Sequence, residues 1–176
     1  MQKYRFLMLF FCGWVFACAP LPSPESFPPN FSPEMMQEVN LSLTFEMLQQ
    51  HPETYKGQVI LLGGDIVSLE VTPEGPLLLE VRQRLLDTQG VPIMEAPTGG
   101  QFWLQYEGRN REEFRIWRRL AVIGEILGVK RQKLAGIGFP IILIKAKAVR
   151  LWPGPGEKKL HPQIYYPWEV TPRGRF

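Results

Sequence analysis

The chain has few of the residues on which most metal sites and enzymes depend. Its 176 residues include two cysteines and two histidines, and His51 and His161 are each followed by proline, without a second histidine or a cysteine at metal-ligand spacing. Structural and catalytic zinc sites need three or four such ligands. A nucleophile-elbow motif and a phosphate-binding glycine loop are also missing. The paired carboxylates Glu112-Glu113 are adjacent in sequence, as on the surface of a helix, and do not resemble an acid/base pair. The sequence predicts no catalytic residue, no metal site and no dissociable cofactor, and therefore a protein that is not an enzyme.

A long hydrophobic run is also missing. The apolar stretch 6–17 follows two positive charges, Lys3 and Arg5, and as a helix it would extend only ~18 Å at ~1.5 Å per residue. The hydrocarbon core of a bilayer is ~30 Å thick, so this stretch is too short to span it comfortably. A basic start, an apolar stretch and a small residue form the pattern of a secretory signal. Residues 1–17 are predicted to be a cleaved signal peptide.

The end of this signal contains the most informative residue of the chain. Val15-Phe16-Ala17-Cys18 resembles the bacterial lipobox, in which the cysteine thiol receives a diacylglyceryl group and the cysteine becomes the mature N-terminus. Cys12 competes poorly, because the bulky Phe11 precedes it. The sequence predicts cleavage between Ala17 and Cys18, with N-acyl and S-diacylglycerol lipid on Cys18. The alternative is an uncleaved apolar anchor in which the cysteine is incidental.

The residues after Cys18 indicate the membrane in which the lipid resides. Aspartate after a lipidated cysteine commonly signals retention in the inner membrane, and here Ala19 and Pro20 follow instead. The expected location is the outer membrane, facing the periplasm. Removal of Lys3 and Arg5 lowers the formal charge from 20 − 17 to 18 − 17, or +1. No strong overall field then favours nucleic acid as a partner.

Beyond the anchor, the chain divides into a tether, a domain and a tail. Six prolines between residues 19 and 33 exclude a helix and predict an extended tether of up to ~46 Å at ~3.1 Å per residue. Residues 18–33 are therefore assigned to the lipidated cysteine and tether, 34–152 to one folded domain and 153–176 to an aromatic, proline-rich tail. The tail either packs across the domain or is an extended recognition segment, and the sequence leaves both open.

Within the domain, hydrophobic residues recur at every second position, as in strands that bury one face. The alternation predicts strands over 58–72, 77–86, 102–106, 120–129 and 141–152. A helix is expected over 41–50, capped by Ser42, and a short helix or structured loop over 112–118. Gly63-Gly64 suggests a bulge or bend within the first strand, and residues 130–140 a connection. Five strands with bent members favour a mainly β fold, a small OB-like barrel, because closure removes exposed sheet edges.

One stretch of this pattern resembles a known family. His51-Pro52-Glu53-Thr54-Tyr55-Lys56-Gly57-Gln58, followed by the double-glycine segment 59–64 and Ile66, is similar to the signature of the Slp family of outer-membrane lipoproteins. The likeness continues through the last strand, ending at Leu151-Trp152-Pro153, and into Tyr165-Tyr166-Pro167-Trp168. Residues 82–100 and the extreme C-terminus match poorly. The resemblance implies a starvation-inducible type of envelope lipoprotein with no assigned catalytic activity, and its only site residue is the acylated Cys18.

One cluster of basic and aromatic residues is a second candidate site. It consists of Arg109, Arg111, Arg115, Arg118 and Arg119, interleaved with Phe114 and Trp117. The favoured interpretation is a solvated helix, in which Glu112 and Glu113 pair with Arg115 or Arg118 at helical spacing and the two aromatic residues belong to the core. Contact with an anionic lipid or glycan comes second. Binding of single-stranded nucleic acid, which also uses basic and aromatic side chains, comes last.

The expected function follows from these features. It is that of a non-enzymatic outer-membrane lipoprotein with a structural or stress-adaptive role in the cell envelope. The alternative is a periplasmic binding module for an anionic lipid or a lipopolysaccharide-like ligand. The expected partners are the membrane, through the lipid on Cys18, together with envelope proteins or anionic lipid, and not nucleic acid.

Overall fold

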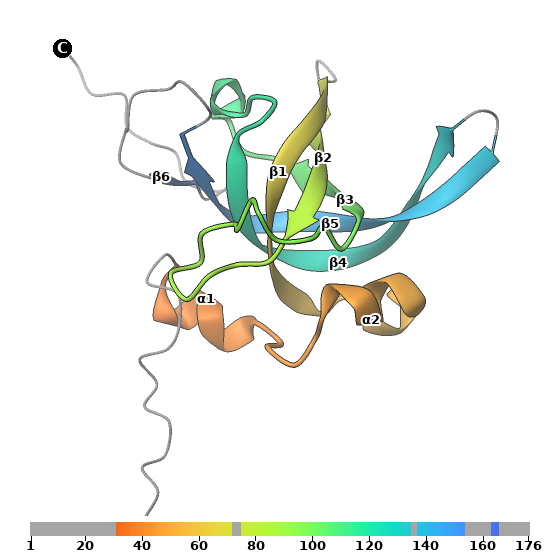
Figure 1. Ribbon diagram of the computed structural model, residues 1–176, viewed down its shortest axis with the longest axis horizontal. Coiled ribbons are helices and arrows are strands. Elements are labelled where there is room, and N and C mark those ends of the chain that lie inside the picture. Colours follow the sequence, from red (N-terminus) through yellow and green to blue (C-terminus); the bar gives the residue numbers. More distant parts are fainter. Residues whose placement is uncertain (1–30, 72–74, 135–136, 154–162, 166–176) are drawn as a thin grey trace, which may run out of the picture.

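The strands of the domain form one sheet that closes on itself. The computed structural model describes residues 31–71, 75–134, 137–153 and 163–165. The strand order is β3-β2-β1-β4-β5-β6, and a parallel pairing of β3 with β5 joins the two sides of the sheet (Figure 1). The expected five-stranded, OB-like barrel is therefore confirmed.

In the described part of the chain, two short helices and two 3₁₀ turns accompany the strands. The helices lie together at the lower side of the barrel in Figure 1, and none of the helices in the described ranges is long and apolar enough to cross a membrane. The helical elements are α1 (Pro33–Glu38), α2 (Phe45–Gln50), η2 (Pro52–Tyr55) and η3 (Arg111–Glu113). The strands are β1 (Val59–Val71), β2 (Leu77–Arg84), β3 (Gln101–Tyr106), β4 (Arg119–Leu134), β5 (Ile137–Trp152) and β6 (Gln163–Tyr165).

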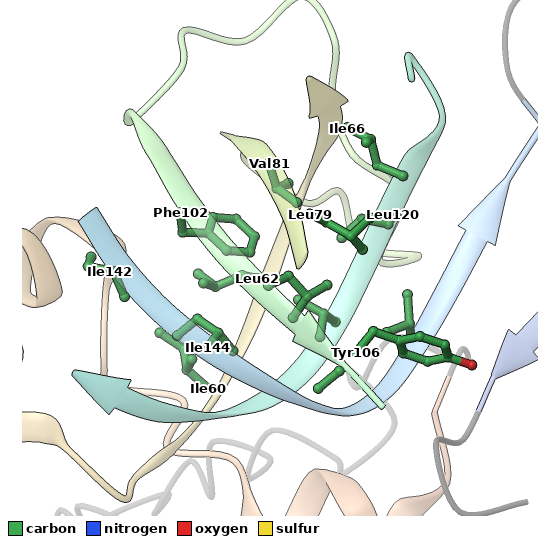
Figure 2. Close-up of a cluster of buried hydrophobic side chains, with 14 of the residues drawn as sticks. Ile60, Leu62, Ile66, Leu79, Val81, Phe102, Tyr106, Leu120, Ile142 and Ile144 are labelled. Carbon is green, nitrogen blue, oxygen red and sulfur yellow. The ribbon is translucent and has the colours of Figure 1, made fainter. Parts of the chain in front are cut away.

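Apolar side chains from all five barrel strands fill the interior. Figure 2 shows these side chains pointing toward one another across the barrel. In β2 and β3 the inward positions are those that the alternation predicts, and each is at most 1% exposed: Leu77, Leu79, Val81, Phe102, Leu104 and Tyr106. Small barrels are filled by side chains in this way. Any contact with another molecule must therefore involve the outer surface of the barrel.

Helix α2 begins later than the sequence predicts. Its N-cap is Thr44, whose hydroxyl accepts a hydrogen bond from the Met47 amide at 3.2 Å. Ser42, the expected cap, donates its hydroxyl instead to the side-chain oxygen of Asn40. The expected cap was wrong because two hydroxyl residues lie close together and only the second precedes helical backbone. Phe45 and Leu48 are buried, as expected.

The double glycine allows β1 and β2 to approach closely. β1 runs unbroken through Gly63 and Gly64, and its register shift lies further on, between Ile66 and Ser68. A Cβ on Gly64 would lie 2.4 Å from the carbonyl oxygen of Arg82, closer than such atoms can pack. The predicted irregularity exists, but the glycine pair provides space for the neighbouring strand and is not itself the bulge.

β4 and β5 are longer than predicted, and the expected connection over 130–140 is wrong. The two strands pair from Arg119↔Trp152 to Leu134↔Ile137, and they extend together beyond the barrel (Figure 1). We call this extension, residues 129–134 and 137–141, the arm. Pro140 suggested a loop, but β5 has only β4 beside it there, and proline is tolerated where a strand has a free edge.

Helix α1 covers a second apolar cluster on the outside of β1, β4 and β5. Its Met36 packs with Ala121, Ile123, Ala148 and Trp152. Phe31, within the segment assigned to the tether, is also buried in this cluster. Part of the tail forms β6, which pairs antiparallel with β5. Most of the tail, residues 154–162 and 166–176, lies outside the described residues.

Candidate functional site

The basic cluster lies in the connection between β3 and β4. We call residues 109–119 the basic loop. Its only helical element is the three-residue turn η3. Of the two alternatives expected over 112–118, a short helix or a structured loop, the structure has the structured loop: the 3₁₀ turn is followed by a second turn, closed by a hydrogen bond from the Arg118 amide to the Arg115 carbonyl oxygen at 3.1 Å. Phe114 is 4% exposed and packs against Tyr106, with 4.6 Å between ring centroids. Its predicted place in the core is confirmed, and it attaches the loop to the barrel.

Arg118 is buried and bonded within the protein. The residue is 8% exposed, and its Nε donates a hydrogen bond to the carbonyl oxygen of Trp152 at 3.1 Å. Its Nη1 donates to the carbonyl oxygen of Glu113 and, at 3.0 Å, to the Glu113 carboxylate. This ion pair joins residues five positions apart in the loop and does not follow helical spacing. Arg118 therefore holds the loop in place and cannot contact a large ligand.

Trp117 is exposed, contrary to its predicted place in the core. The residue is 57% exposed and its φ of +71° lies in the left-handed region. The Trp117 amide donates to the Ile66 carbonyl at 2.9 Å, and the Ile66 amide donates to the Arg118 carbonyl at 3.0 Å. These bonds fix the backbone on both sides of the ring. The sequence spacing of Phe114 and Trp117 suggested one helical face, but the positive φ turns the indole outward.

The remaining arginines of the loop differ in exposure. Arg109 and Arg115 are exposed, while Arg111 and Arg119 are half-buried. Arg111 donates through Nη2 to the carbonyl oxygen of Gly75 at 2.6 Å, which joins the loop to the turn before β2. Arg119 is the first residue of β4 and lies opposite Asp65 of β1. The predicted cluster is thus divided between exposed and structural positions.

Beside the loop lies a buried ion cluster that the sequence analysis did not find. Asp65 is 1% exposed, and its carboxylate lies 2.9 Å from Arg84 Nε and 3.3 Å from Arg82 Nη2. The guanidinium carbon of Arg82 is 5.7 Å from the centroid of the Trp117 ring. Two guanidinium groups therefore share one carboxylate next to the exposed indole. An aspartate within an apolar strand was the available signal, but its partners depend on strand register.

A second polar network connects the outer face of β1–β3 to the arm. Glu80 accepts a hydrogen bond from the Ser68 hydroxyl at 2.8 Å. The Trp103 indole donates to Gln132 at 3.2 Å, and the ammonium group of Lys130 lies 3.7 Å from the Trp103 ring centroid. Trp103 is only 2% exposed although it points away from the barrel interior. This network covers the face on which OB folds commonly bind ligands.

A groove lies between α2 and the strands β1 and β2. It encloses about 410 Å³, within the range of small-molecule sites. Its walls include Phe45 and Leu61, and also Arg84, which is already paired with Asp65. Among the described residues, no three of the types His, Cys, Asp and Glu gather as metal ligands would.

Comparison with known proteins supplies the identification. The sequence model of the outer membrane lipoprotein Slp family matches residues 17–174. The chain belongs to this family. No curated protein and no solved structure matches it.

The family match also covers the proposed processing site. It starts at Ala17, one residue before Cys18, and includes the whole described barrel of this Slp-family chain. Ala17 and Cys18 themselves lie outside the described residues, so the predicted cleavage and acylation remain predictions. The resemblance found in the sequence, with Tyr55 and Gly57 at the entry to β1, is confirmed at the level of the family.

Proposed function

We propose that this Slp-family chain is a non-enzymatic lipoprotein that is cleaved between Ala17 and Cys18 and acylated on Cys18. The lipid holds it in the outer membrane on the periplasmic side. Its role in this proposal is structural or stress-adaptive, and the barrel acts through contacts with other envelope components. The observation that carries the proposal is the family match, which begins at the residue before Cys18 and extends through the barrel to residue 174.

Separation of inner and outer membranes by density tests the proposal. Wild type is compared with Cys18→Ser and with Cys12→Ser, a matched control that removes the other cysteine of the chain. We expect wild type and Cys12→Ser in the outer-membrane fraction, and Cys18→Ser outside it because an unacylated chain retains its signal. Recovery of Cys18→Ser in the outer membrane at the wild-type level would contradict the proposal.

A second candidate function is the binding of an anionic lipid or a lipopolysaccharide-like ligand by the basic loop. The observation that favours it is the exposure of Arg109 and Arg115 on either side of η3. Reversal of charge at Arg118 would be a poor test, because that residue is buried and bonded to Glu113. The suitable variant is Arg109→Glu with Arg115→Glu, which should abolish retention on immobilised lipopolysaccharide while the far-UV circular dichroism stays unchanged. Retention equal to wild type would exclude this candidate.

A further inference from the structure

Residues 116 and 117, which we call the tip of the basic loop, expose two neighbouring apolar side chains. Ile116 is 48% exposed and Trp117 is 57% exposed. Within the described ranges, they are the only exposed large apolar residues that are adjacent in sequence. Single exposed apolar residues are common on protein surfaces, and only large contiguous apolar patches mark interaction sites by themselves, so the backbone and the charges around this pair also bear on its role.

The backbone presents this pair in a fixed orientation. A bulky residue in the left-handed region is strained, and such outliers concentrate at functional sites. The hydrogen bonds between Trp117 and Ile66 hold the tip against β1, and the bonds of Arg118 to Glu113 and Trp152 hold the segment behind it. The loop is therefore ordered before any partner binds. Because the indole is exposed, the strain at Trp117 is not offset by burial of the ring.

Positive charges outnumber negative charges around the tip. The basic loop contains five arginines and two glutamates, a formal charge of 5 − 2 = +3. The mature chain that begins at Cys18 has a formal charge of 18 − 17 = +1, so the rest of the mature chain sums to 1 − 3 = −2. Glu113 is already paired with Arg118, which leaves Glu112 as the other carboxylate of the loop. Arg109 and Arg115 are exposed on either side of these groups.

We propose that Ile116 and Trp117 insert into the headgroup region of an anionic phospholipid bilayer while Arg109 and Arg115 contact its phosphate groups. This rests on the proposed anchor at Cys18 and gives the same protein a second, non-covalent membrane contact. Tryptophan is favoured at membrane interfaces, because its ring is apolar and its N–H is polar. Exposed arginines are attracted to anionic headgroups. The predicted tether makes this second contact intramolecular, so a weak affinity suffices.

A single thiol at the tip tests the contact. Cys12 and Cys18 are the only cysteines, so the acylated mature chain carrying Ile116→Cys has one thiol for a fluorescent label. The matched control is Phe139→Cys, at an exposed apolar position of the arm. In vesicles of phosphatidylethanolamine with phosphatidylglycerol, we expect lipid-borne quenchers to reach the label at 116 several-fold more than the label at 139. The difference should shrink in phosphatidylcholine vesicles and at high salt. Equal quenching at the two positions would overturn the proposal.

Charge reversal at the loop tests the role of the arginines. Arg109→Glu with Arg115→Glu should reduce quenching at 116 to the level of the control label, whereas Arg131→Glu, at an exposed position of the arm, should leave it unchanged. If quenching is unchanged in the double variant, the proposed arginine contacts are wrong. A label at 116 that is protected from quenching by aqueous acrylamide when lipopolysaccharide is added, but not when phosphatidylglycerol is added, would also overturn the proposal. That result would support the second candidate function.

The intact mass of the same sample shows whether Cys18 is acylated. It therefore separates a negative result caused by a missing lipid anchor from one caused by a basic loop that does not bind the bilayer. An unacylated chain contradicts the proposed function, and its flotation with the same vesicles still tests the loop. Flotation that is lost in the arginine double variant supports the inference. Flotation that the double variant does not change overturns it.

Discussion

Two neighbouring residues with opposite exposure determine the shape of the basic loop. Arg118 is buried and bonded to two carbonyl oxygens and a carboxylate, while Trp117 points outward from strained backbone. A buried carbonyl oxygen without a hydrogen-bond donor loses its hydration and gains nothing in exchange. The hydrogen bonds from the Arg118 guanidinium group therefore stabilise the folded loop. The loop can therefore hold a residue at a costly φ value.

Substitutions at Trp117 should reverse the usual order of alanine and glycine. A non-glycine residue in the left-handed region costs about 1–3 kcal/mol, and alanine retains this cost whereas glycine does not. We expect the free energy of unfolding of Trp117→Gly to exceed that of Trp117→Ala by about 1 kcal/mol, as measured by urea denaturation. An alanine variant that is more stable than the glycine variant would show that the backbone at 117 is not strained.

Arg118 should matter for stability far more than its neighbour Arg115. Arg118→Met fills a similar volume but leaves the Trp152 and Glu113 carbonyl oxygens without their donor. We expect a loss of about 2–4 kcal/mol in the free energy of unfolding. Arg115→Met, at an exposed position, should change it by about 0.5 kcal/mol or less. Similar losses for the two variants in chemical denaturation would contradict the structural role of Arg118.

The buried hydroxyl of Tyr106 should make stability fall at high pH. Burial, with a smaller contribution from the Glu112 carboxylate, raises the pKa of Tyr106 from 10.0 to about 12. The folded chain therefore keeps this proton between pH 10 and 12 while the unfolded chain loses it. The free energy of unfolding should fall across this window by roughly 1.4 kcal/mol per pH unit. Tyr106→Phe keeps the ring and should lack this part of the pH dependence in denaturation series. If wild type and variant show the same slope, the shifted pKa does not contribute.

At the scale of elements, close packing of β1 against β2 depends on the absence of a side chain at Gly64. Its would-be Cβ meets the Arg82 carbonyl oxygen and the Val81 side chain, both at 2.4 Å. Gly138, at the start of β5, has nothing within 4 Å of the same position. The two glycines therefore form a matched pair for substitution.

Alanine at these positions should have opposite consequences. Gly64→Ala must displace the backbone of β2, and overpacking costs about 1–3 kcal/mol. Gly138→Ala should leave the midpoint of thermal unfolding unchanged or raise it, because it adds no clash and reduces the freedom of the unfolded chain. Differential scanning calorimetry of the two variants checks this, and a Gly64→Ala variant as stable as wild type would refute the close approach.

The sequence predicted the elements whose burial follows a simple period. In β2 and β3 every second residue faces the barrel interior, so the alternation predicts the core positions of Leu77, Leu79 and Phe102 correctly. The arm escaped prediction because Val129 and Phe139 are exposed there, and the glycines and Pro140 resemble a loop. Exposed two-stranded ribbons have no buried face to set a pattern.

The site was less predictable than the fold, because its contacts join distant segments. The pairing of Asp65 with Arg82 and Arg84 depends on the register of β1 against β2. The spacing of Phe114 and Trp117 suits one face of a helix and predicts that both lie in the core, but the positive φ of Trp117 separates the two side chains. Which arginines are buried likewise depends on the course of the loop and not on its composition.

At the scale of the whole molecule, the protein is a filled barrel with a proposed attachment to a membrane. The described barrel provides the rigid surface, with the basic loop on its outside. The family provides the outer membrane as its setting. The lipid on Cys18 is the proposed link between them, and both the location of the protein and the second membrane contact depend on it.

The most direct test of this account is the intact mass of the mature protein extracted from membranes, with Cys18→Ser measured beside it. We predict a wild-type mass that corresponds to a chain beginning at Cys18 with three acyl groups, and absence of that species in Cys18→Ser. A wild-type chain that keeps residues 1–17, or that begins at Cys18 without lipid, would contradict the central claim.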